Sequence, residues 1–241
     1  MLEAGKIKGI ILDYGGTIDS NGVHWSEVIR SAYKALNINV DKATFREAYK
    51  HGERTLASNR IVLPSHNFWH VLRLKAEAQL QWLLQNNVLP TSYDITLHAA
   101  HIADWCYAGA QNSINAARPI LKKLSERYPL ILVTNFYGNI RAVLEDFYLS
   151  NFFTAIIESA VVGIRKPDPA IFSLGVEITD FKPEEIAVVG DSYDKDIAPA
   201  TACGCQTIWL RKTGWDAFFK DEASDLIITD FAELKTVFSL T

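Results

Sequence analysis

Short, continuously apolar runs recur along the chain, and each is bounded by polar or turn-forming residues. The runs occupy residues 7–12, 130–134, 155–159, 186–190, 206–210 and 225–229. Continuous rather than alternating apolarity is typical of strands that are buried on both faces, as in a parallel sheet. The pattern therefore predicts six strands of one parallel sheet.

Amphipathic stretches with helical spacing separate most of these runs. They cover residues 114–127, 138–148, 168–178, 194–202 and 231–238. Strands that alternate with helices form right-handed strand–helix–strand units, in which the helices cover both faces of the sheet. The sequence thus predicts an α/β protein with a doubly wound parallel sheet.

One long gap interrupts this alternation. Between about residue 21 and residue 110 we find no strand pattern, and four stretches have helical spacing: 25–36, 41–57, 65–87 and 92–109. We therefore predict a sheet-containing core made of residues 1–20 and 111–241, with a helical domain, residues 21–110, inserted after the first strand. Such an insert would lie above the carboxyl ends of the strands, where open α/β sheets bind their ligands.

Composition narrows the classes of function. The 241 residues are 49% hydrophobic and 22% charged, which is ordinary for a globular protein that is not embedded in a membrane. The net charge of −4 and the absence of a broad basic stripe argue against a nucleic-acid partner. No apolar run is long enough for a membrane span, and the apolar start lacks a cleavage site, which predicts a cytoplasmic protein.

The three cysteines, Cys106, Cys203 and Cys205, are an odd and small number, which favours free thiols in a reducing compartment. Cys203 and Cys205 form a C-x-C pair that could bind a soft metal. No second pair of Cys or His residues completes a tetrahedral site, however. The simpler interpretation is two small residues on either side of a turn at Gly204.

Polar and charged residues stand where several predicted strands end. They are Asp13, after the first strand; Thr134 and Asn135, at the end of the second; Lys166, in the loop GIRKPDPAIF; and Asp191, Asp194 and Asp196, after IAVVG. The carboxyl ends of parallel strands meet at one edge of a sheet, so these side chains should converge. Together they predict an anionic, metal-assisted site.

Four motifs in this order resemble those of the haloacid dehalogenase-like (HAD) hydrolase superfamily: DYGGTIDS, LVTN, Lys166 with Pro167, and GDSYDKD. The resemblance extends over nearly the whole chain, and the helical insert resembles the C1-type cap of that family. It implies a Rossmann-like HAD core with an all-helical cap. It also implies a phosphatase-type hydrolase, with an aspartate nucleophile and a small phosphorylated metabolite as substrate.

The resemblance also implies a nucleophile and a metal site. Asp13 would attack phosphorus and form an aspartyl-phosphate, which water then cleaves. Mg²⁺ would be held by Asp13, the backbone carbonyl of Gly15, and Asp191. Asp196 would bind the ion through water, and an all-oxygen set of ligands suits this hard cation.

Further residues would bind the phosphoryl group. Thr134 would donate a hydrogen bond to a phosphoryl oxygen, helped by backbone N–H groups after Asp13 and near Asn135. Lys166 would pair with both the nucleophile and the phosphoryl oxygens. Together these groups would neutralise the charge that spreads over the equatorial oxygens, which is the main task in phosphoryl transfer.

Each of these residues also has a plain structural interpretation. Asp13 can cap a turn whose glycines allow positive φ, and Thr134 can simply end a strand. Asp196 can be a first-turn acid favoured by the helix dipole, and Lys166 can be a surface lysine. The dipeptide at 168–169 is typical of an N-cap followed by the first helical residue.

Gly15 departs from the family pattern. HAD phosphatases usually carry a second aspartate two residues after the nucleophile, where it protonates the leaving oxygen and later activates water. General acid–base catalysis is typically worth about 10²–10⁴-fold in rate, so a phosphatase with glycine here should be slow on poor leaving groups. Asp19, His24, His51 and His66 are the residues that we considered as replacements, and for Asp19 we favour a local structural role.

Gly15 also leaves two other functions open. One is a phosphonate or carbon–halogen hydrolase of the same superfamily, and a phosphonate hydrolase would need a cap lysine for a Schiff base. The candidates for that lysine are Lys34, Lys42, Lys50 and Lys75. A metal-free dehalogenase fits the acidic GDSYDKD motif poorly, because its carboxylates would repel one another. The other function is a weakened protein that only binds metal or phosphate.

Overall fold

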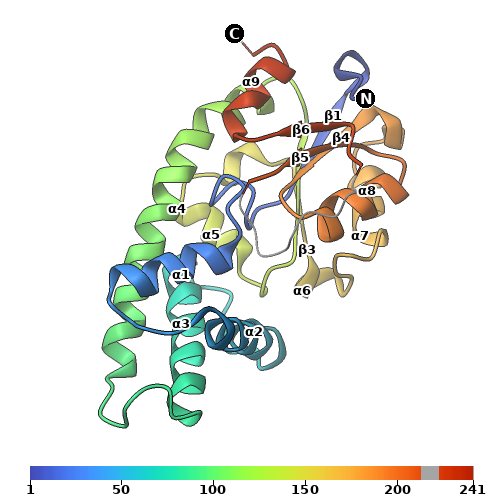
Figure 1. Cartoon of the computed structure of the whole chain (residues 1–241). Coiled ribbons are helices and arrows are strands. Elements are labelled where there is room, and N and C mark those ends of the chain that lie inside the picture. Colours follow the sequence, from blue (N-terminus) through green and yellow to red (C-terminus); the bar gives the residue numbers. More distant parts are fainter. Residues whose placement is uncertain (213–222, 241) are drawn as a thin grey trace.

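The computed structural model of the chain describes residues 1–212 and 223–240. Figure 1 shows a sheet flanked by helices in one part of the molecule and a bundle of helices in the other. We call the second part the helical lobe, formed by α1 (Trp25–Ala35), α2 (Lys42–Ser58), α3 (Phe68–Gln85) and the first half of α4 (Ile95–Ser125). The sheet with its own helices is the sheet lobe.

The sheet contains the six predicted strands. They are β1 (Gly9–Leu12), β2 (Leu130–Thr134), β3 (Ala155–Glu158), β4 (Ile186–Gly190), β5 (Gln206–Leu210) and β6 (Leu226–Ile228). Their order is β3-β2-β1-β4-β5-β6, and every neighbouring pair is parallel. The doubly wound parallel sheet is therefore confirmed, and three of its strands are one or two residues shorter than predicted.

Burial on both faces explains the continuous apolarity of the central strands. Every residue of β1, β2 and β4 is buried. Along β1, Ile11 packs on one side with Ile131 of β2, while Ile10 and Leu12 belong to the larger core cluster on the other side. Successive side chains of a strand point to opposite faces, so a strand in the middle layer needs apolar residues at every position.

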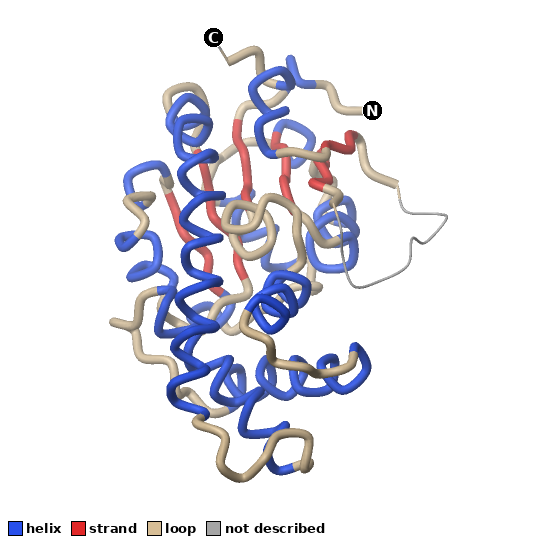
Figure 2. The backbone as a smooth tube through the Cα atoms, turned by 60° about the vertical axis from the view of Figure 1, so that its left-hand side comes forward, coloured by secondary structure: helices blue, strands red, loops and turns tan. Residues whose placement is uncertain are grey.

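Shorter helices cover the sheet on both faces (Figure 2). They are α5 (Ile140–Asp146), α6 (Ser159–Val162), α7 (Ala170–Glu177), α8 (Ala198–Ala202) and α9 (Leu234–Val237). Short 3₁₀ turns occupy Ala4–Lys6, Ser150–Phe152, Pro183–Glu185 and Phe231–Glu233, and a π turn occupies Tyr193–Ile197. The predicted helix at 194–202 is thus a π turn followed by α8.

Helix α4 corrects one prediction. The stretches 92–109 and 114–127, predicted as separate helices, are one helix of 31 residues that runs from the helical lobe to the sheet (Figure 1). A proline in the interior of a helix normally breaks it, yet Pro119 lies inside α4. The helix continues because buried residues before and after Pro119 form one apolar face that packs against the core. The domain boundary predicted between residues 110 and 111 therefore falls within a continuous helix.

The cysteines occupy ordinary positions. All three are free thiols, and Cys203 and Cys205 flank Gly204, whose φ of +82° makes the turn before β5. The Cys203 thiol donates to the carbonyl of Pro169 over 3.0 Å. Within residues 1–212 and 223–240, the cluster of ligand atoms that could hold a metal contains no cysteine.

Candidate active site

The predicted site residues meet at the carboxyl edge of three adjacent strands. Asp13 follows β1, Thr134 ends β2, and Asp191 follows β4. Strand order changes direction at β1, which is where open α/β sheets bind their ligands. Together with Lys166 these residues line a cavity of about 140 Å³, whose walls come from both lobes.

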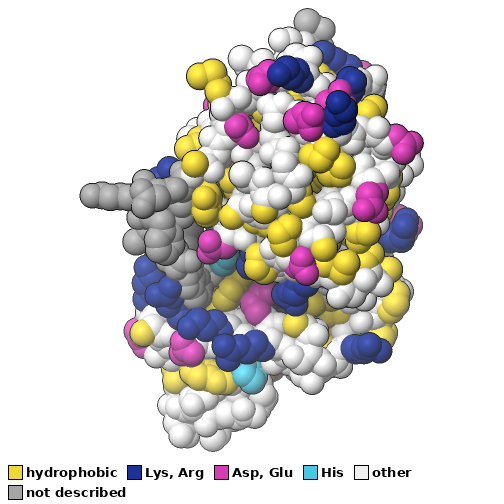
Figure 3. Space-filling view, turned by 90° about the vertical axis from the view of Figure 1, so that its right-hand side faces the viewer, with side chains coloured by type: hydrophobic (Ala, Val, Ile, Leu, Met, Phe, Trp, Pro, Cys, Tyr) yellow, Lys and Arg dark blue, Asp and Glu magenta, His cyan; other side chains and the backbone are white. Residues whose placement is uncertain are grey.

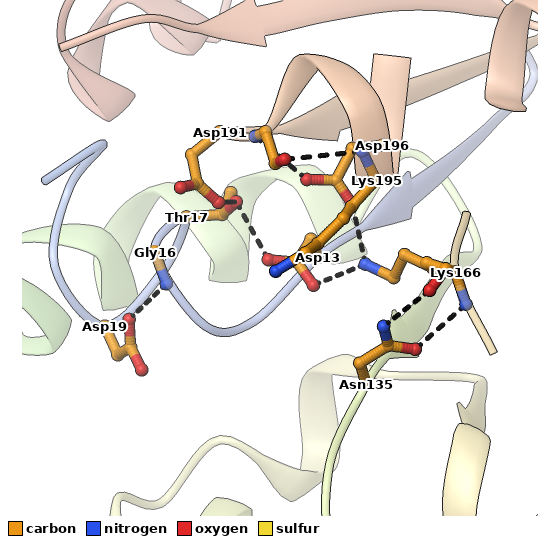
Figure 4. A network of polar contacts seen from close by, with 10 residues as sticks. Asp13, Gly16, Thr17, Asp19, Asn135, Lys166, Asp191, Lys195 and Asp196 are labelled. Carbon is orange, nitrogen blue, oxygen red and sulfur yellow. Dashed lines mark hydrogen bonds and ion pairs between the residues drawn. The ribbon is translucent and has the colours of Figure 1, made fainter. Parts of the chain in front are cut away.

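Lys166 forms the centre of the ion-pair network. Its Nζ lies 2.5 Å from Asp13 Oδ1 and 2.7 Å from Asp196 Oδ1, and its side chain is buried (Figure 4). Burial alone would disfavour the charge, but Asp13 and Asp196 outweigh it and raise the pKa of the Lys166 ammonium above its ordinary value. Lys166 is therefore a fixed cation next to the candidate nucleophile, and not a solvated surface lysine.

Asn135 holds this lysine in place. Its side-chain amide donates to the carbonyl of Lys166 and accepts from the N–H of Lys166, each over 3.0 Å. The sequence led us to expect backbone N–H groups near Asn135 to contact the phosphoryl group, and the structure adds this side-chain role. The amide clamp fixes the backbone from which the Lys166 side chain reaches Asp13.

Three carboxylates form the candidate metal centre. Oxygen atoms of Asp13, Asp191 and Asp196 lie within 4.8 Å of one another. Burial raises the pKa of Asp13 to about 6, with Lys166 opposing the rise, and burial with the neighbouring carboxylates raises the pKa of Asp191 well above its ordinary range. Carboxylates crowded in this way, with one buried lysine beside them, need further positive charge. This donor set fits Mg²⁺, and Gly15 lines the same cavity.

Two glycines allow the carboxylates to approach the strand ends. A Cβ atom on Gly16, whose φ is +102°, would lie 2.4 Å from the oxygens of Asp191. A Cβ atom on Gly190 would lie 2.3 Å from the Cβ of Asp196. Any side chain at these positions would displace a carboxylate, so glycine is needed for the site to form.

Thr17 connects two of the carboxylates, and sequence reasoning assigned it no role. Its hydroxyl lies 3.2 Å from Asp13 Oδ2 and 3.3 Å from Asp191 Oδ1, so it can donate to either oxygen. The only sequence signal was its place in DYGGTIDS. Thr134 is buried and lines the cavity, at the edge of the sheet where we expected it.

Asp19 makes local structural contacts of the kind that we favoured for it, and it also lines the cavity. Its Oδ1 accepts from the N–H of Gly16 over 2.7 Å, and the indole N–H of Trp25 lies 3.0 Å from both carboxylate oxygens. These bonds hold the turn between β1 and the helical lobe. Burial raises the pKa of Asp19 to about 7, although the bonds from Gly16 and Trp25 act in the opposite direction.

Three histidines could replace the acid that is missing at Gly15, and of these His24 lines the cavity. Its Nδ1 accepts from the N–H of Ser26 over 3.2 Å and caps helix α1. His51 is not part of the described cavity lining. His66 lies elsewhere, where its Nδ1 accepts from the N–H of Leu63 and its ring stacks on His70.

Cations also stand at the opening of the cavity. Arg165 and Lys195 are exposed and line it, and the Lys195 side chain reaches from the π turn toward Asp13 (Figure 4). Figure 3 shows an acidic side chain recessed between the two lobes, with Lys and Arg side chains around it. Positive charge around the opening can draw anions toward the recessed site.

The comparison with protein families decides the identity of this fold. The model of the haloacid dehalogenase-like hydrolases matches residues 7–204. The chain belongs to this family.

Among the described helices, none is both long and apolar enough to cross a membrane.

Curated relatives of this HAD hydrolase include several phosphatases. The glyceraldehyde 3-phosphate phosphatase of Pyrococcus furiosus is 34% identical over 92 residues, which cover 37% of this chain and 38% of that protein. The phosphoserine phosphatase of Thermus thermophilus is 32% identical over 106 residues, or 44% and 42% of the two chains. The chain thus spans about two fifths of the length of these relatives.

Solved structures share the fold over nearly the whole chain. YfnB of Bacillus subtilis, in a crystal structure bound to magnesium, has a TM-score of 0.60 at 18% identity and covers 96% of this chain and 98% of its own. The L-2-haloacid dehalogenase of Xanthobacter autotrophicus, with chloropropionic acid covalently bound, has a TM-score of 0.60 at 16% identity, with 97% and 98% covered. At this identity the similarity establishes the fold alone.

We expect the carboxylate cluster to make the stability of the fold depend on both pH and Mg²⁺. The folded-state pKa of Asp13, about 6, lies above its ordinary value of 3.8, so the native protein binds a proton more tightly than the unfolded chain does. Stability without metal should therefore fall as pH rises through this range. We expect Mg²⁺ to raise the melting temperature by about 3–6 °C near pH 7.5 and by less near pH 5.5, where protons compete with it.

Thermal denaturation at both pH values measures this effect. Asp191→Asn should reduce the rise at the higher pH, because it removes one ligand. Asp180→Asn, in an exposed turn remote from the site, serves as the matched control. An equal effect of Mg²⁺ on Asp191→Asn and on the native protein would contradict the assignment of the metal centre.

Proposed function

We propose that this HAD hydrolase is a magnesium-dependent phosphatase that acts on small phosphorylated molecules through an aspartyl-phosphate on Asp13. The observation that carries the proposal is the position of Lys166, held between Asp13 and Asp196 beside Asp191. A buried cation and a cluster of carboxylates suit a phosphoryl group and a divalent cation, respectively. The phosphatases among the curated relatives support the same class of substrate.

The proposed reaction has two steps. A carboxylate oxygen of Asp13 attacks phosphorus, the bond from phosphorus to the leaving oxygen breaks, and the phosphoryl group is transferred to Asp13. Water then attacks the same phosphorus and releases inorganic phosphate and the free carboxylate. Lys166 neutralises the phosphoryl oxygens, and the Thr134 hydroxyl donates to one of them.

Mg²⁺ would be held by Asp13, Asp191 and the backbone carbonyl of Gly15, with Asp196 binding it through water, and would supply positive charge to the phosphoryl oxygens. Asn135 and Thr17 would keep Lys166 and the carboxylates in position. Residues of the helical lobe form part of the cavity wall and would limit the access of bulk water to the phosphoryl group.

The contacts of Lys75 do not favour a phosphonate hydrolase that uses a Schiff base. Three of the four candidate lysines are exposed, namely Lys34, Lys42 and Lys50. The fourth, Lys75, lines the cavity. Burial would lower the pKa of Lys75, but Glu53 outweighs it and raises the pKa above its ordinary value. A Schiff base needs a neutral amine, so the pairing with Glu53 opposes this chemistry.

Release of phosphate from acetyl phosphate and para-nitrophenyl phosphate tests the proposal. Both leaving groups depart as stable anions, so they need little help from the acid that is missing at Gly15. We expect turnover of both compounds with Mg²⁺, and a loss of at least about 100-fold when the metal is removed with a chelator. Turnover that is unaffected by metal removal would contradict the proposal.

A further inference from the structure

A second polar cluster faces the cavity from the helical lobe. Glu53 of α2, Lys75 of α3 and Tyr137, from the loop after β2, line the same cavity as Asp13. Lys75 Nζ lies 2.6 Å from Glu53 Oε1, and the Tyr137 hydroxyl donates to Glu53 Oε2 over 3.0 Å. The Lys75 ammonium also lies 5.6 Å from the centre of the Tyr137 ring. None of these residues belongs to the four motifs, and the proposed phosphoryl transfer does not need them.

The cluster contains one negative and one positive side chain. Burial would raise the pKa of Glu53, but Lys75 and Tyr137 hold it below its ordinary value, so Glu53 stays anionic while Lys75 stays cationic. The net charge of the pair is therefore zero. The pair therefore adds no net positive charge that would attract a leaving group ending in a carboxylate or a second phosphate, and at short range Glu53 would repel such a group.

Folding stability alone does not account for this ion pair. Burying the Lys75 ammonium removes most of its contact with water, and replacing buried ion pairs by apolar residues is often neutral or stabilising. The Lys75 side chain is only 10% exposed, yet it lies beside a cavity and not within the apolar core. A binding role accounts for its place there.

The walls between the two polar ends of the cavity are apolar. This part of the cavity is lined by five apolar side chains: Trp25, Phe68, Val71, Leu72 and Phe136. Trp25 and Phe68 pack edge to face, with ring centroids 5.2 Å apart. A ligand that fits this arrangement has a phosphoryl group at one end, a short carbon chain, and a polar, uncharged group at the other end.

We propose that Glu53, Lys75 and Tyr137 form a subsite for the leaving group, and that the substrates carry a hydroxyl group at the end remote from phosphorus. Such a hydroxyl can donate to the carboxylate of Glu53 or to the oxygen of Tyr137, whose own hydrogen goes to Glu53, and it can accept from Lys75. The assignment of a leaving group rests on the proposed phosphatase function. Since Tyr137 comes from the sheet lobe and the other two from the helical lobe, the subsite is complete only when both lobes meet.

Binding of matched phosphonates tests the subsite without requiring turnover. The probes are 3-hydroxypropylphosphonate and butylphosphonate, which have equal length and differ by a terminal hydroxyl or methyl group, and 2-carboxyethylphosphonate, which ends in a charge. Affinities are measured by titration calorimetry in the presence of Mg²⁺. We expect the hydroxyl compound to bind at least about 10-fold more tightly than either of the others.

Variants locate the selectivity. Tyr137→Phe and Glu53→Gln should each reduce the preference for the hydroxyl compound to less than about 3-fold. The matched control is Glu47→Gln, an exposed glutamate of the same helix that pairs with Lys50 and should leave the preference unchanged. Circular dichroism verifies that each variant folds.

Each outcome separates the subsite from the proposed function. Equal binding of the hydroxyl and methyl compounds, preference for the carboxylate, or unchanged selectivity in Tyr137→Phe and Glu53→Gln would overturn the subsite. Hydrolysis of acetyl phosphate without binding of any probe would also refute the subsite, while the phosphatase function would stand. Selective binding without hydrolysis of any phosphate would support the subsite and refute the phosphatase.

Discussion

Asp13→Asn is expected to lower Mg²⁺-dependent release of phosphate from acetyl phosphate by at least about 10³-fold, because an amide cannot act as the nucleophile. Asparagine has almost the same shape as aspartate, so packing at the end of β1 should survive. The variant also removes one partner of Lys166, which keeps Asp196 at 2.7 Å as its second partner. Initial rates over a range of substrate concentrations separate a loss in kcat from a change in KM.

The controls for this variant separate chemistry from folding and from metal binding. Asp180→Asn makes the same chemical change in an exposed turn and should leave the rate unaltered. The melting temperature of Asp13→Asn should stay close to that of the native protein. If Asp13→Asn folds, binds Mg²⁺ and retains a native rate, Asp13 is not the nucleophile.

Gly15→Asp is expected to raise the hydrolysis of alkyl phosphates by about 10²-fold or more, because it places a proton donor where the family phosphatases carry one. The structure has room for it, since a Cβ atom on Gly15 meets nothing within 4 Å and the backbone there does not have a positive φ. The gain should be much smaller for acetyl phosphate, whose leaving group needs no proton. Rates on both compounds measure the difference.

Gly15→Asn is the matched control for this gain. It has the size and shape of the aspartate variant but no carboxyl group to donate a proton. If Gly15→Asn gains as much as Gly15→Asp, or if neither variant improves alkyl phosphate hydrolysis, then the missing acid does not limit the reaction. A different reaction or a binding role would then be the better explanation for Gly15.

Most of the sheet could be predicted, because residues in strands buried on both faces are apolar at every position. The runs at 130–134, 186–190 and 206–210 match β2, β4 and β5 without any shift. The division of α4 into two helices was wrong, because small residues between 108 and 113 interrupt the apolar pattern. Ala110 and Ile114 are buried nonetheless, since the helix continues along the same face of the core.

The sequence predicts the site residues that stand at or directly after the end of a strand. It gives less information about contacts that form when distant segments of the chain pack together. Asp13, Thr134 and Asp191 were expected at one edge of the sheet, and they line one cavity. The clamp of Asn135 on Lys166 joins residues 31 positions apart, and the bond from Tyr137 to Glu53 joins residues 84 positions apart. Neither pair has a spacing that marks it in the sequence.

The HAD family assignment is confirmed, while the magnesium requirement, the domain boundaries, the roles of individual site residues and the cytoplasmic location stay predictions. The family match covers residues 7–204 and so includes all four motifs. Gly15 lies inside this range, which means that family membership alone does not reveal what replaces the acid. That question depends on experiments with the two Gly15 variants.

The covalent intermediate tests the central claim most directly. The native protein is mixed with acetyl phosphate and Mg²⁺, quenched in acid within milliseconds, digested and analysed by mass spectrometry. We predict that the peptide containing Asp13 gains the mass of one phosphoryl group, and that this gain is absent in Asp13→Asn and decays when the substrate is exhausted. Turnover without any phosphorylated Asp13 peptide, or phosphorylation at another residue, would contradict the account.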